Sequence, residues 1–545
     1  MKKRTILLST FFTFSSSFFS LELIAQTTDR PDYSSYILTP AAPSTPRINS
    51  ARVFGVRPGS PFLFTIAATG DRPMTFSAKG LPAGLKLNAK NGQISGTVNK
   101  NGEYDVVLTA KNAKGSYDQK FRIVVGDKLA LTPPMGWNNW NCWGNSVSQE
   151  KVLSSARAMV EKGLINYGWS YINIDDGWQG IRGGKYNAIQ SNQKFPDMKA
   201  MADKIHQMGL KIGIYTGPWL GTYAGHIGTQ CDNADGTYDW IKEGKHNENY
   251  KYVMPDDPQG NKVRREHYHH AKYSFAENDA KQWADWGIDY LKYDWFPNDY
   301  YYTREMHDAL LKTNRDIVYS LSNSAPYGDA PVWMTYSNCW RTTGDIRDTW
   351  ESMSKIGFAQ DKWIAFNGPS HWADPDMLVV GMVGWGPKLH YTRLTPDEQF
   401  THISLWALLG SPMLIGCDMA QLDDFTISLL CNFEVNDVNM DPLGLQAYPY
   451  YSDDTYVTYV KHLEDGSMAV GMFNKTAEPK EIGFIPKSLG LRGDQTIRDL
   501  WRQKDLTTIP AKERFDTMVP AHGVVLVKIY PGNSRERDFG PQANK

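Results

Sequence analysis

The feature that most constrains the fold is a strand, loop and helix pattern that repeats from about residue 128 to residue 441. Eight short apolar segments fit buried strands, and polar loops and stretches with helical spacing follow them. These segments are 135–137, 171–174, 211–215, 290–293, 317–320, 334–336, 363–366 and 412–415. Eight strands that alternate with helices over roughly 300 residues predict a (β/α)8 TIM barrel for residues 128–441.

The segments on either side of this region have a different pattern. Residues 46–127 and 442–532 contain short alternating apolar runs separated by Gly, Asn and Pro, so each predicts a β-sandwich. In the first, Gly80-Leu81-Pro82-Ala83-Gly84 is followed by Gly92-Gln93-Ile94-Ser95-Gly96-Thr97. This pair resembles the Ig-like, cadherin-like modules attached to exported bacterial enzymes, which implies a spacer or docking module without chemistry of its own.

The N-terminus has the features of a secretory signal peptide. Lys2-Lys3-Arg4 precedes an apolar and serine-rich segment, 6–19, that is too short to span a bilayer, and cleavage is expected after Ala25. Residues 26–45 are predicted to be a flexible linker, and 533–545 a polar tail. No later segment reaches about 18 uninterrupted apolar residues. We therefore expect an exported protein without a membrane span, either periplasmic or secreted.

The composition argues against some classes of binding partner but does not identify one. The net charge is −1 and no Lys/Arg-rich run indicates a nucleic acid. The 18 Trp and 29 Tyr indicate either a large aromatic core or carbohydrate binding, because a flat ring packs against the C–H face of a sugar. Five cysteines without CxxC spacing argue against a zinc site, and we expect most of them to be buried free thiols. The oligomeric state is not predicted.

An insertion, 221–272, follows the third predicted strand. It is too long for a plain connector, so we interpret it as a lid or a subsite wall. Its end, Glu266-His267-Tyr268-His269-His270, contains potential metal ligands, but a polar loop rim is the favoured interpretation. We expect no metal site.

Polar residues gather where the predicted strands end, which is where the active sites of such barrels lie. Lys292 and Asp294 share one face of their strand, so the lysine is expected to keep Asp294 ionised at neutral pH. An ionised carboxylate suits a nucleophile, and a carboxylate from another strand suits a proton donor; together they can hydrolyse glycosides. A helix N-cap is the favoured interpretation of Asp348 and an equal alternative for Asp374.

Five motifs occur in the order found in family 27 of the glycoside hydrolases, the α-galactosidase or melibiase family, which the chain resembles. They are Pro134-Met135-Gly136-Trp137-Asn138-Asn139-Trp140, Ile174-Asp175-Asp176-Gly177-Trp178, Leu291-Lys292-Tyr293-Asp294, Trp340-Arg341 with Gly344-Asp345-Ile346, and Trp372-Ala373-Asp374-Pro375-Asp376-Met377. The resemblance implies an exo-acting hydrolase that releases terminal α-linked galactose from oligo- or polysaccharides, without a metal or organic cofactor.

The same resemblance assigns roles to single residues. Asp294 would be the nucleophile and Asp345 the acid/base of a reaction that retains configuration. The terminal sugar would be bound by Trp140, Asp175, Asp176, Tyr215, Lys292, Arg341 and Asp376. Asp175 and Asp176 would bind the hydroxyls at carbons 4 and 6. The mechanism requires carboxyl groups roughly 5–5.5 Å apart and an Asp345 whose pKa is raised by Asp294 and by partial burial.

Two departures from the family bear on these roles. Many members carry a cysteine after the paired aspartates, bonded to one after the first strand; Gly177 stands there, so Cys142 lacks this partner. The loop after the fifth strand, often Cys-Glu-Trp in the family, is Leu321-Ser322-Asn323-Ser324-Ala325. Ser322 is therefore a candidate substrate-binding residue that could make room for a 2-acetamido group.

These departures leave alternatives to α-galactosidase, which we favour. Within the family they are α-N-acetylgalactosaminidase, β-L-arabinopyranosidase and isomalto-dextranase. Outside it, a non-catalytic carbohydrate-binding protein would require loss of a catalytic acid, yet Asp294 and Asp345 are both present. An adhesion module built on the two β-domains is a further alternative.

Overall fold

The computed structural model describes residues 30–238 and 266–532. The predicted signal peptide, 1–25, and the predicted tail, 533–545, lie outside the described residues. Within the described ranges, none of the helices combines the length and the apolar character needed to cross a membrane.

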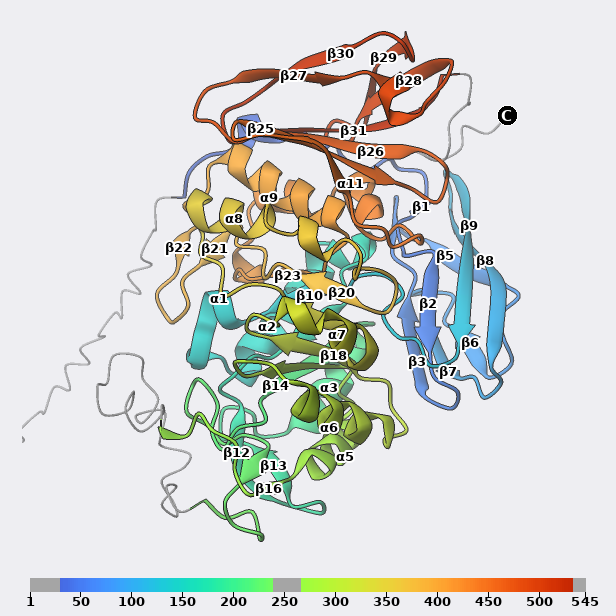
Figure 1. The fold of residues 1–545 in the computed structure, drawn as a ribbon. Coiled ribbons are helices and arrows are strands. Elements are labelled where there is room, and N and C mark those ends of the chain that lie inside the picture. Colours follow the sequence, from blue (N-terminus) through green and yellow to red (C-terminus); the bar gives the residue numbers. More distant parts are fainter. Residues whose placement is uncertain (1–29, 239–265, 533–545) are drawn as a thin grey trace, which may run out of the picture. The chain divides into compact units, whose positions relative to one another are not determined.

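Eight parallel strands form the predicted barrel (Figure 1). In order around the sheet they are β10 (Met135–Asn138), β11 (Tyr171–Asn173), β14 (Lys211–Thr216), β17 (Tyr290–Asp294), β18 (Val318–Ser322), β19 (Cys339–Arg341), β20 (Trp372–Asp374) and β23 (Met413–Ile415). Strand β23 pairs with β10, and Leu378, just after β20, bridges to Ile415. The bridge connects the segment after β20 to β23, which already pairs with β10, so the barrel is closed.

Six of the eight predicted barrel strands are confirmed, with ends shifted by one or two residues. The sixth and seventh predicted strands are wrong. Residues 334–336 form the end of helix α7 (Ala330–Tyr336), and 363–366 begins at the last residue of the 3-10 helix η6 (Asp361–Trp363) and contains no strand. The actual strands, β19 and β20, have three residues each. A short apolar run fits a buried helix face as well as a strand, and three residues are too few to show a period.

Helices follow the strands and cover the barrel. They are α1 (Trp140–Trp143), α2 (Gln149–Glu161), α3 (Met198–Gln207), α5 (Ala276–Trp286), α6 (Tyr300–Leu311), α7, α8 (Trp350–Gly357), α9 (Pro396–Leu409), α10 (Asp424–Leu430) and α11 (Phe433–Asn439). Thr395 and Glu398 form a capping box at the start of α9, and Gly410 ends it with φ +59° in the left-handed region.

Neither Asp348 nor Asp374 caps a helix. Thr349 caps α8, whereas the fully buried Asp348 accepts hydrogen bonds from Arg393 and His390. Asp374 is the last residue of β20, and its Oδ1 accepts the backbone N–H of Asp376 at 2.7 Å. Sequence alone could not separate these cases, because capping and ion pairing both use an aspartate close to a helix.

The N-terminal Ig-like domain has two main sheets around its own apolar core. One contains β2 (Val53–Val56), β5 (Thr75–Lys79), β8 (Gly102–Asn112) and β9 (Gly115–Val125); the other contains β3 (Pro61–Thr65), β6 (Leu85–Leu87) and β7 (Gln93–Thr97). A short pair, β1 (Arg47–Ile48) and β4 (Ala68–Thr69), accompanies them. The predicted sandwich is therefore present.

The C-terminal domain is the predicted antiparallel β-sandwich. Its larger sheet contains β24 (Tyr448–Ser452), β25 (Tyr456–His462), β26 (Met468–Asn474), β28 (Asp494–Asp499), β29 (Lys504–Pro510) and β31 (Val524–Pro531); β27 (Lys480–Phe484) pairs with β30 (Phe515–Val519). Helix α9 packs against β26 and β31 (Figure 1). The indole N–H of Trp501 also donates to Ser404 of α9 at 2.9 Å.

The described part of the predicted linker is in contact with the barrel. The ring of Tyr33 lies 5.8 Å from that of Tyr391 and 5.4 Å from that of Phe425, measured between ring centroids. Thr39 donates to the backbone carbonyl of Ser428. The expectation of a flexible linker is thus wrong for this part, because a few apolar anchors within a Pro- and Ser-rich segment are enough to hold it.

The cysteines and tryptophans serve the interior. We expected most of the cysteines to be buried free thiols; all five lie in the described residues, and all are free and buried. Ten tryptophans are less than 2% exposed: Trp137, Trp169, Trp178, Trp283, Trp295, Trp333, Trp340, Trp363, Trp372 and Trp406. A large aromatic core therefore accounts for most of the tryptophan content.

One buried ion pair holds a hairpin to the barrel. Arg182 of β12 (Gln179–Gly183) contacts Asp279 of α5 through two hydrogen bonds, of 2.6 and 3.0 Å, and the two side chains are 1% and 0% exposed. The backbone N–H of Ile189 in β13 (Ala188–Ser191) also donates to Asp279. Removing one charge would leave the other buried and unpaired.

We predict that Asp279→Asn lowers the free energy of unfolding by about 3–5 kcal/mol, because Arg182 loses its counter-charge. The matched control is Asp203→Asn, which breaks the Lys199–Asp203 pair, whose side chains are 55% and 47% exposed. The control should change stability by at most about 0.5 kcal/mol. Thermal unfolding of both variants checks this, and equal shifts in Tm would contradict it.

Candidate active site

A pocket of about 450 Å³ opens at the carboxyl ends of the barrel strands. Its lining consists of Trp140, Asp175, Asp176, Tyr215, Tyr223, Lys292, Asp294, Phe296, Asn323, Ser324 and Asp345. Seven of the ten predicted site residues are in this lining; Ser322, Arg341 and Asp376 are not. The volume is within the range of about 300–1,000 Å³ that is typical of small-molecule sites.

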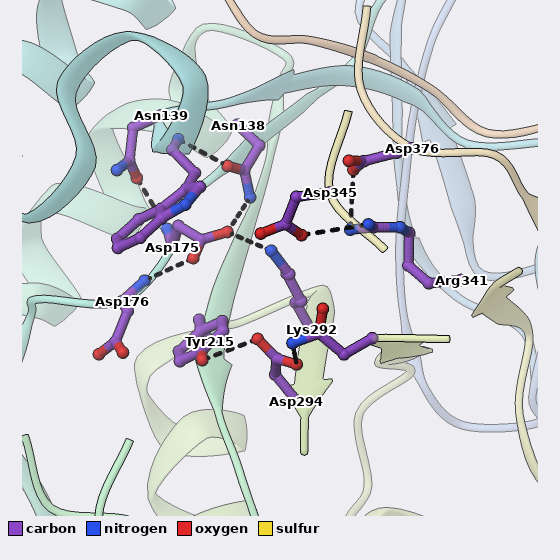
Figure 2. A network of polar contacts seen from close by, with 12 residues as sticks. Asn138, Asn139, Asp175, Asp176, Tyr215, Lys292, Asp294, Arg341, Asp345 and Asp376 are labelled. Atoms are coloured by element: carbon purple, nitrogen blue, oxygen red, sulfur yellow. Dashed lines mark hydrogen bonds and ion pairs between the residues drawn. The ribbon is translucent and has the colours of Figure 1, made fainter. Parts of the chain in front are cut away.

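Both carboxylate oxygens of Asp294, the last residue of β17, accept hydrogen bonds, one from a residue of β14 and one from the loop after β18 (Figure 2). The hydroxyl of Tyr215 donates to Oδ2 at 2.9 Å, and the amide of Asn323 donates to Oδ1 at 2.7 Å. The side chain is therefore oriented without a substrate. Burial raises its pKa to about 7, since the charge of Lys292 only partly offsets burial and Asp345 adds to it. The expectation that Lys292 keeps Asp294 ionised at neutral pH is thus met only in part.

Lys292 donates its hydrogen bond to Asp175 rather than to Asp294. Lys292 Nζ donates to Asp175 Oδ2 at 2.8 Å, and the Asn138 amide donates to the same oxygen at 2.8 Å (Figure 2). Burial opposes the charge on Lys292, but Asp175 and Asp294 raise its pKa above the ordinary value. Lys292 therefore remains charged and joins the second barrel strand to the fourth.

Asp176 lies deeper, with 1% of its surface exposed. The hydroxyl of Thr222 donates to Oδ1 at 2.9 Å and the backbone N–H of Ala224 donates to Oδ2 at 2.7 Å. Burial raises its pKa to about 6. Both donors belong to the start of the 221–272 insertion, so this segment forms part of the pocket wall.

Asp345 is held by an arginine at the end of β19. Arg341 contacts Asp345 Oδ1 at 3.2 Å with one nitrogen and Asp376 Oδ1 at 2.8 Å with another (Figure 2). The side chains of Arg341 and Asp376 are 4% and 5% exposed, whereas that of Asp345 is 53% exposed. Arg341 and Asp376 therefore lie behind Asp345 and fix its position.

The expected rise in the pKa of Asp345 is not found in the free site. Partial burial does raise this pKa, but the positive charges of Arg341 and Lys292 outweigh burial and lower it below the ordinary value. Sequence reasoning considered the repulsion by Asp294 and missed Arg341 as the neighbour of Asp345. The raised pKa belongs to Asp294 instead.

Ser322 does not line the pocket, so its predicted contact with substrate is not supported. It is the last residue of β18, is 1% exposed, and pairs in register with Asp294. The next two residues, Asn323 and Ser324, line the pocket instead, with φ angles of +68° and +60°. These left-handed conformations, which Asn tolerates better than most residues, turn the Asn323 amide toward Asp294.

Tyr223 and Phe296 are the other lining residues that sequence reasoning missed. The ring of Tyr223 packs against those of Trp219 and Tyr268, with centroids 5.4 and 5.0 Å apart. Two of these three aromatics, Tyr223 and Tyr268, belong to the 221–272 insertion, and Trp219 lies just before it. The middle of the insertion, 239–265, lies outside the described residues, and so does the lid that we expected there.

One of the histidines at the end of the insertion, His270, serves packing in the described structure. The ring of His270 stacks on that of Tyr302 with centroids 3.6 Å apart. Across residues 30–238 and 266–532, no group of three or more His, Cys, Asp or Glu side chains is arranged to hold a metal ion.

Three family models match the chain, in the order of its domains. The one described as "alpha galactosidase A" matches residues 132–240 and 246–441, more than half of the 545 residues. The "alpha galactosidase C-terminal beta sandwich domain" matches residues 453–529, and the "putative Ig domain" matches residues 19–126. The matches thus cover the barrel and both β-domains.

Known proteins give the same picture. A probable alpha-galactosidase of Dictyostelium discoideum is 32% identical over 74% of this chain and 94% of its own length. A Bacteroides fragilis structure described as a "putative alpha-galactosidase" is 31% identical, with a TM-score of 0.77 over 91% of this chain and 99% of that one. A GH27 β-L-arabinopyranosidase of Geobacillus stearothermophilus is 27% identical, with a TM-score of 0.62 over 75% and 98% of the two chains. The chain belongs to the alpha-galactosidase family of glycoside hydrolases, GH27.

Proposed function

We propose that this chain is an exo-acting, retaining α-galactosidase that removes terminal α-linked galactose from carbohydrates. The observation that carries the proposal is a pocket with two differently held carboxyl groups. Asp294 is buried between two donors, and Asp345 is half exposed on an arginine. The family and the alpha-galactosidases among the relatives support the same activity.

In the first step, a carboxylate oxygen of Asp294 bonds to the anomeric carbon while the bond to the leaving oxygen breaks. Asp345 gives its proton to that oxygen. In the second step, Asp345 takes a proton from water, whose oxygen bonds to the anomeric carbon and releases the Asp294 carboxylate. Two displacements retain configuration. The expected carboxyl separation of about 5–5.5 Å stays a prediction.

The buried end of the pocket provides the recognition of galactose. Asp175 and Asp176 are 2% and 1% exposed, and their positions are fixed by Lys292, Asn138 and the insertion. We assign them to the hydroxyls at carbons 4 and 6 of the terminal sugar. An axial 4-hydroxyl that reaches a fixed carboxylate distinguishes galactose from glucose.

The two catalytic carboxyl groups share one proton in this proposal. In the free site Arg341 favours the charge on Asp345, while burial favours the proton on Asp294. Catalysis needs the opposite arrangement with the same total number of protons. Coupled groups titrate as a pair, so the singly protonated pair is the active form.

We predict that kcat/KM falls as the pH rises through about 7, the pKa of Asp294. Above this value the pair loses the proton that Asp345 must donate. If instead Asp294 had to ionise independently of Asp345, the activity would rise through the same pH.

The pH profile of the wild type on a disaccharide decides between these outcomes. The matched variant is Asp345→Asn, assayed on an aryl galactoside whose leaving group needs no proton. This variant should lose the alkaline fall. A fall that persists in the variant would contradict the shared proton.

The alternative activities, α-N-acetylgalactosaminidase and β-L-arabinopyranosidase, differ from α-galactosidase in the terminal sugar that they release. The side chain of Ser322 is buried, so it provides no space for a 2-acetamido group. Asn323 lines the pocket instead, and its amide donates to Asp294. This favours a 2-hydroxyl. β-L-arabinopyranosidase activity stays an alternative, because an enzyme with that activity is among the structural neighbours.

We predict that the p-nitrophenyl α-galactoside is hydrolysed at least about tenfold faster than the α-N-acetylgalactosaminide and the β-L-arabinopyranoside. One lost or misfitting hydrogen bond is worth roughly this factor. Asp294→Ala should abolish turnover of all three, whereas Asp329→Ala, an exposed control, should not. Preference for either competing sugar would overturn the assignment, and turnover of none would point to a non-catalytic binding protein.

We further propose export through the signal peptide of residues 1–25, to the periplasm or the medium. The support is the basic start and the apolar segment of the sequence.

Expression of the full-length chain in a bacterial host should give a mature protein that begins at Gln26, as measured by intact mass. Replacing Leu7 and Leu8 by Arg should block export, because it interrupts the apolar segment. Cleaved protein from that variant, or a full-length wild type confined to the cytoplasm, would contradict the proposal.

A further inference from the structure

We propose that Phe296 is the platform of an acceptor subsite, on which the sugar ring of the leaving group stacks. This inference rests on the proposed hydrolysis and names a binding site beyond the terminal galactose. The ligand is an uncharged pyranose ring, the sugar linked to the galactose.

The first observation is the exposure of Phe296 beside a buried catalytic strand. Phe296 is 55% exposed, whereas Asp294 and Trp295, which precede it, are 8% and 0% exposed. Among the large hydrophobic side chains that are exposed in the described part of the chain, Phe296 is the one that lines the active-site pocket. Covering an apolar ring that faces water lowers the free energy, so this ring favours binding of a ligand.

The second observation is the rigidity of the turn that presents the ring. The amide of Asn298 donates to the carbonyls of Trp295 at 2.8 Å and Ser322 at 3.1 Å. Asp299 accepts the indole N–H of Trp295 at 3.1 Å and caps helix α6 through the N–H of Tyr302 at 3.0 Å. The backbone on both sides of Phe296 is therefore fixed, so little entropy is lost when a ring stacks there.

The third observation places Phe296 at the open end of the pocket. Of the eleven lining residues, only Phe296 and Asp345 are exposed. Asp345 must reach the leaving oxygen to protonate it, so the leaving group extends toward this open end. The buried end is closed by Asp175 and Asp176. A leaving sugar thus passes the side of the pocket that carries the Phe296 ring.

The chemistry of the surface selects a sugar ring as the occupant. Aromatic side chains contribute a large apolar area with a specific geometry, and the C–H face of a pyranose is flat and apolar. The platform has no charge of its own. It therefore adds affinity for a sugar leaving group and none for a leaving group of a single atom.

The test compares two substrates that differ only in the leaving group. One is an α-1,6-linked galactosyl-glucose disaccharide and the other is α-galactosyl fluoride. Phe296→Ala should lower kcat/KM for the disaccharide about tenfold, the effect of losing one aromatic stacking contact, and leave the fluoride within about twofold. Phe296→Trp should restore hydrolysis of the disaccharide.

The matched control is Tyr301→Ala, which removes an aromatic side chain that is 64% exposed and does not line the pocket. It should change neither substrate. Equal losses on both substrates for Phe296→Ala, or no loss on the disaccharide, would overturn the subsite. Failure of the wild type to hydrolyse either substrate would instead reject the proposed function.

Discussion

Two cations, the partly buried Lys292 and the buried Arg341, hold the acidic pocket together. Lys292 lies on Asp175 within reach of the charge of Asp294, and Arg341 joins Asp345 to Asp376 (Figure 2). Without them, several carboxylates gathered in a buried site would repel one another and take up protons. Each cation comes from a barrel strand, Lys292 from β17 and Arg341 from β19, so the geometry of the sheet positions both of them.

The cations also decide how the site distributes its proton. Arg341 stabilises charge on Asp345, and burial disfavours charge on Asp294. In the free site the pKa of Asp294 is therefore raised, whereas that of Asp345 is lowered. In the proposed mechanism, a substrate that fills the pocket changes the surroundings of both groups, so that one proton moves between them. The donors from Tyr215 and Asn323 orient Asp294 in the free site.

The pocket has two ends with different physical character. The buried end contains the fixed carboxylates that we assign to sugar hydroxyls, and part of its wall comes from the insertion after β14 through Thr222 and Ala224. The open end carries the half-exposed Asp345 and the ring of Phe296. In the proposed function, directional hydrogen bonds at the buried end select the terminal sugar, and apolar contact at the open end binds the linked sugar.

The sequence by itself determined the architecture and most of the acidic pocket. The alternation of apolar segments predicts the barrel between two sandwiches, and local motifs such as Leu291-Lys292-Tyr293-Asp294 keep their residues in order along one strand. Tertiary structure alone decided what depends on contacts between distant segments. Arg341 reverses the expected pKa shift of Asp345, two left-handed residues bring Asn323 rather than Ser322 to the pocket, and a pinned turn exposes Phe296. Periodicity reports which face of an element is buried, whereas charge coupling and loop direction arise only when separate strands meet.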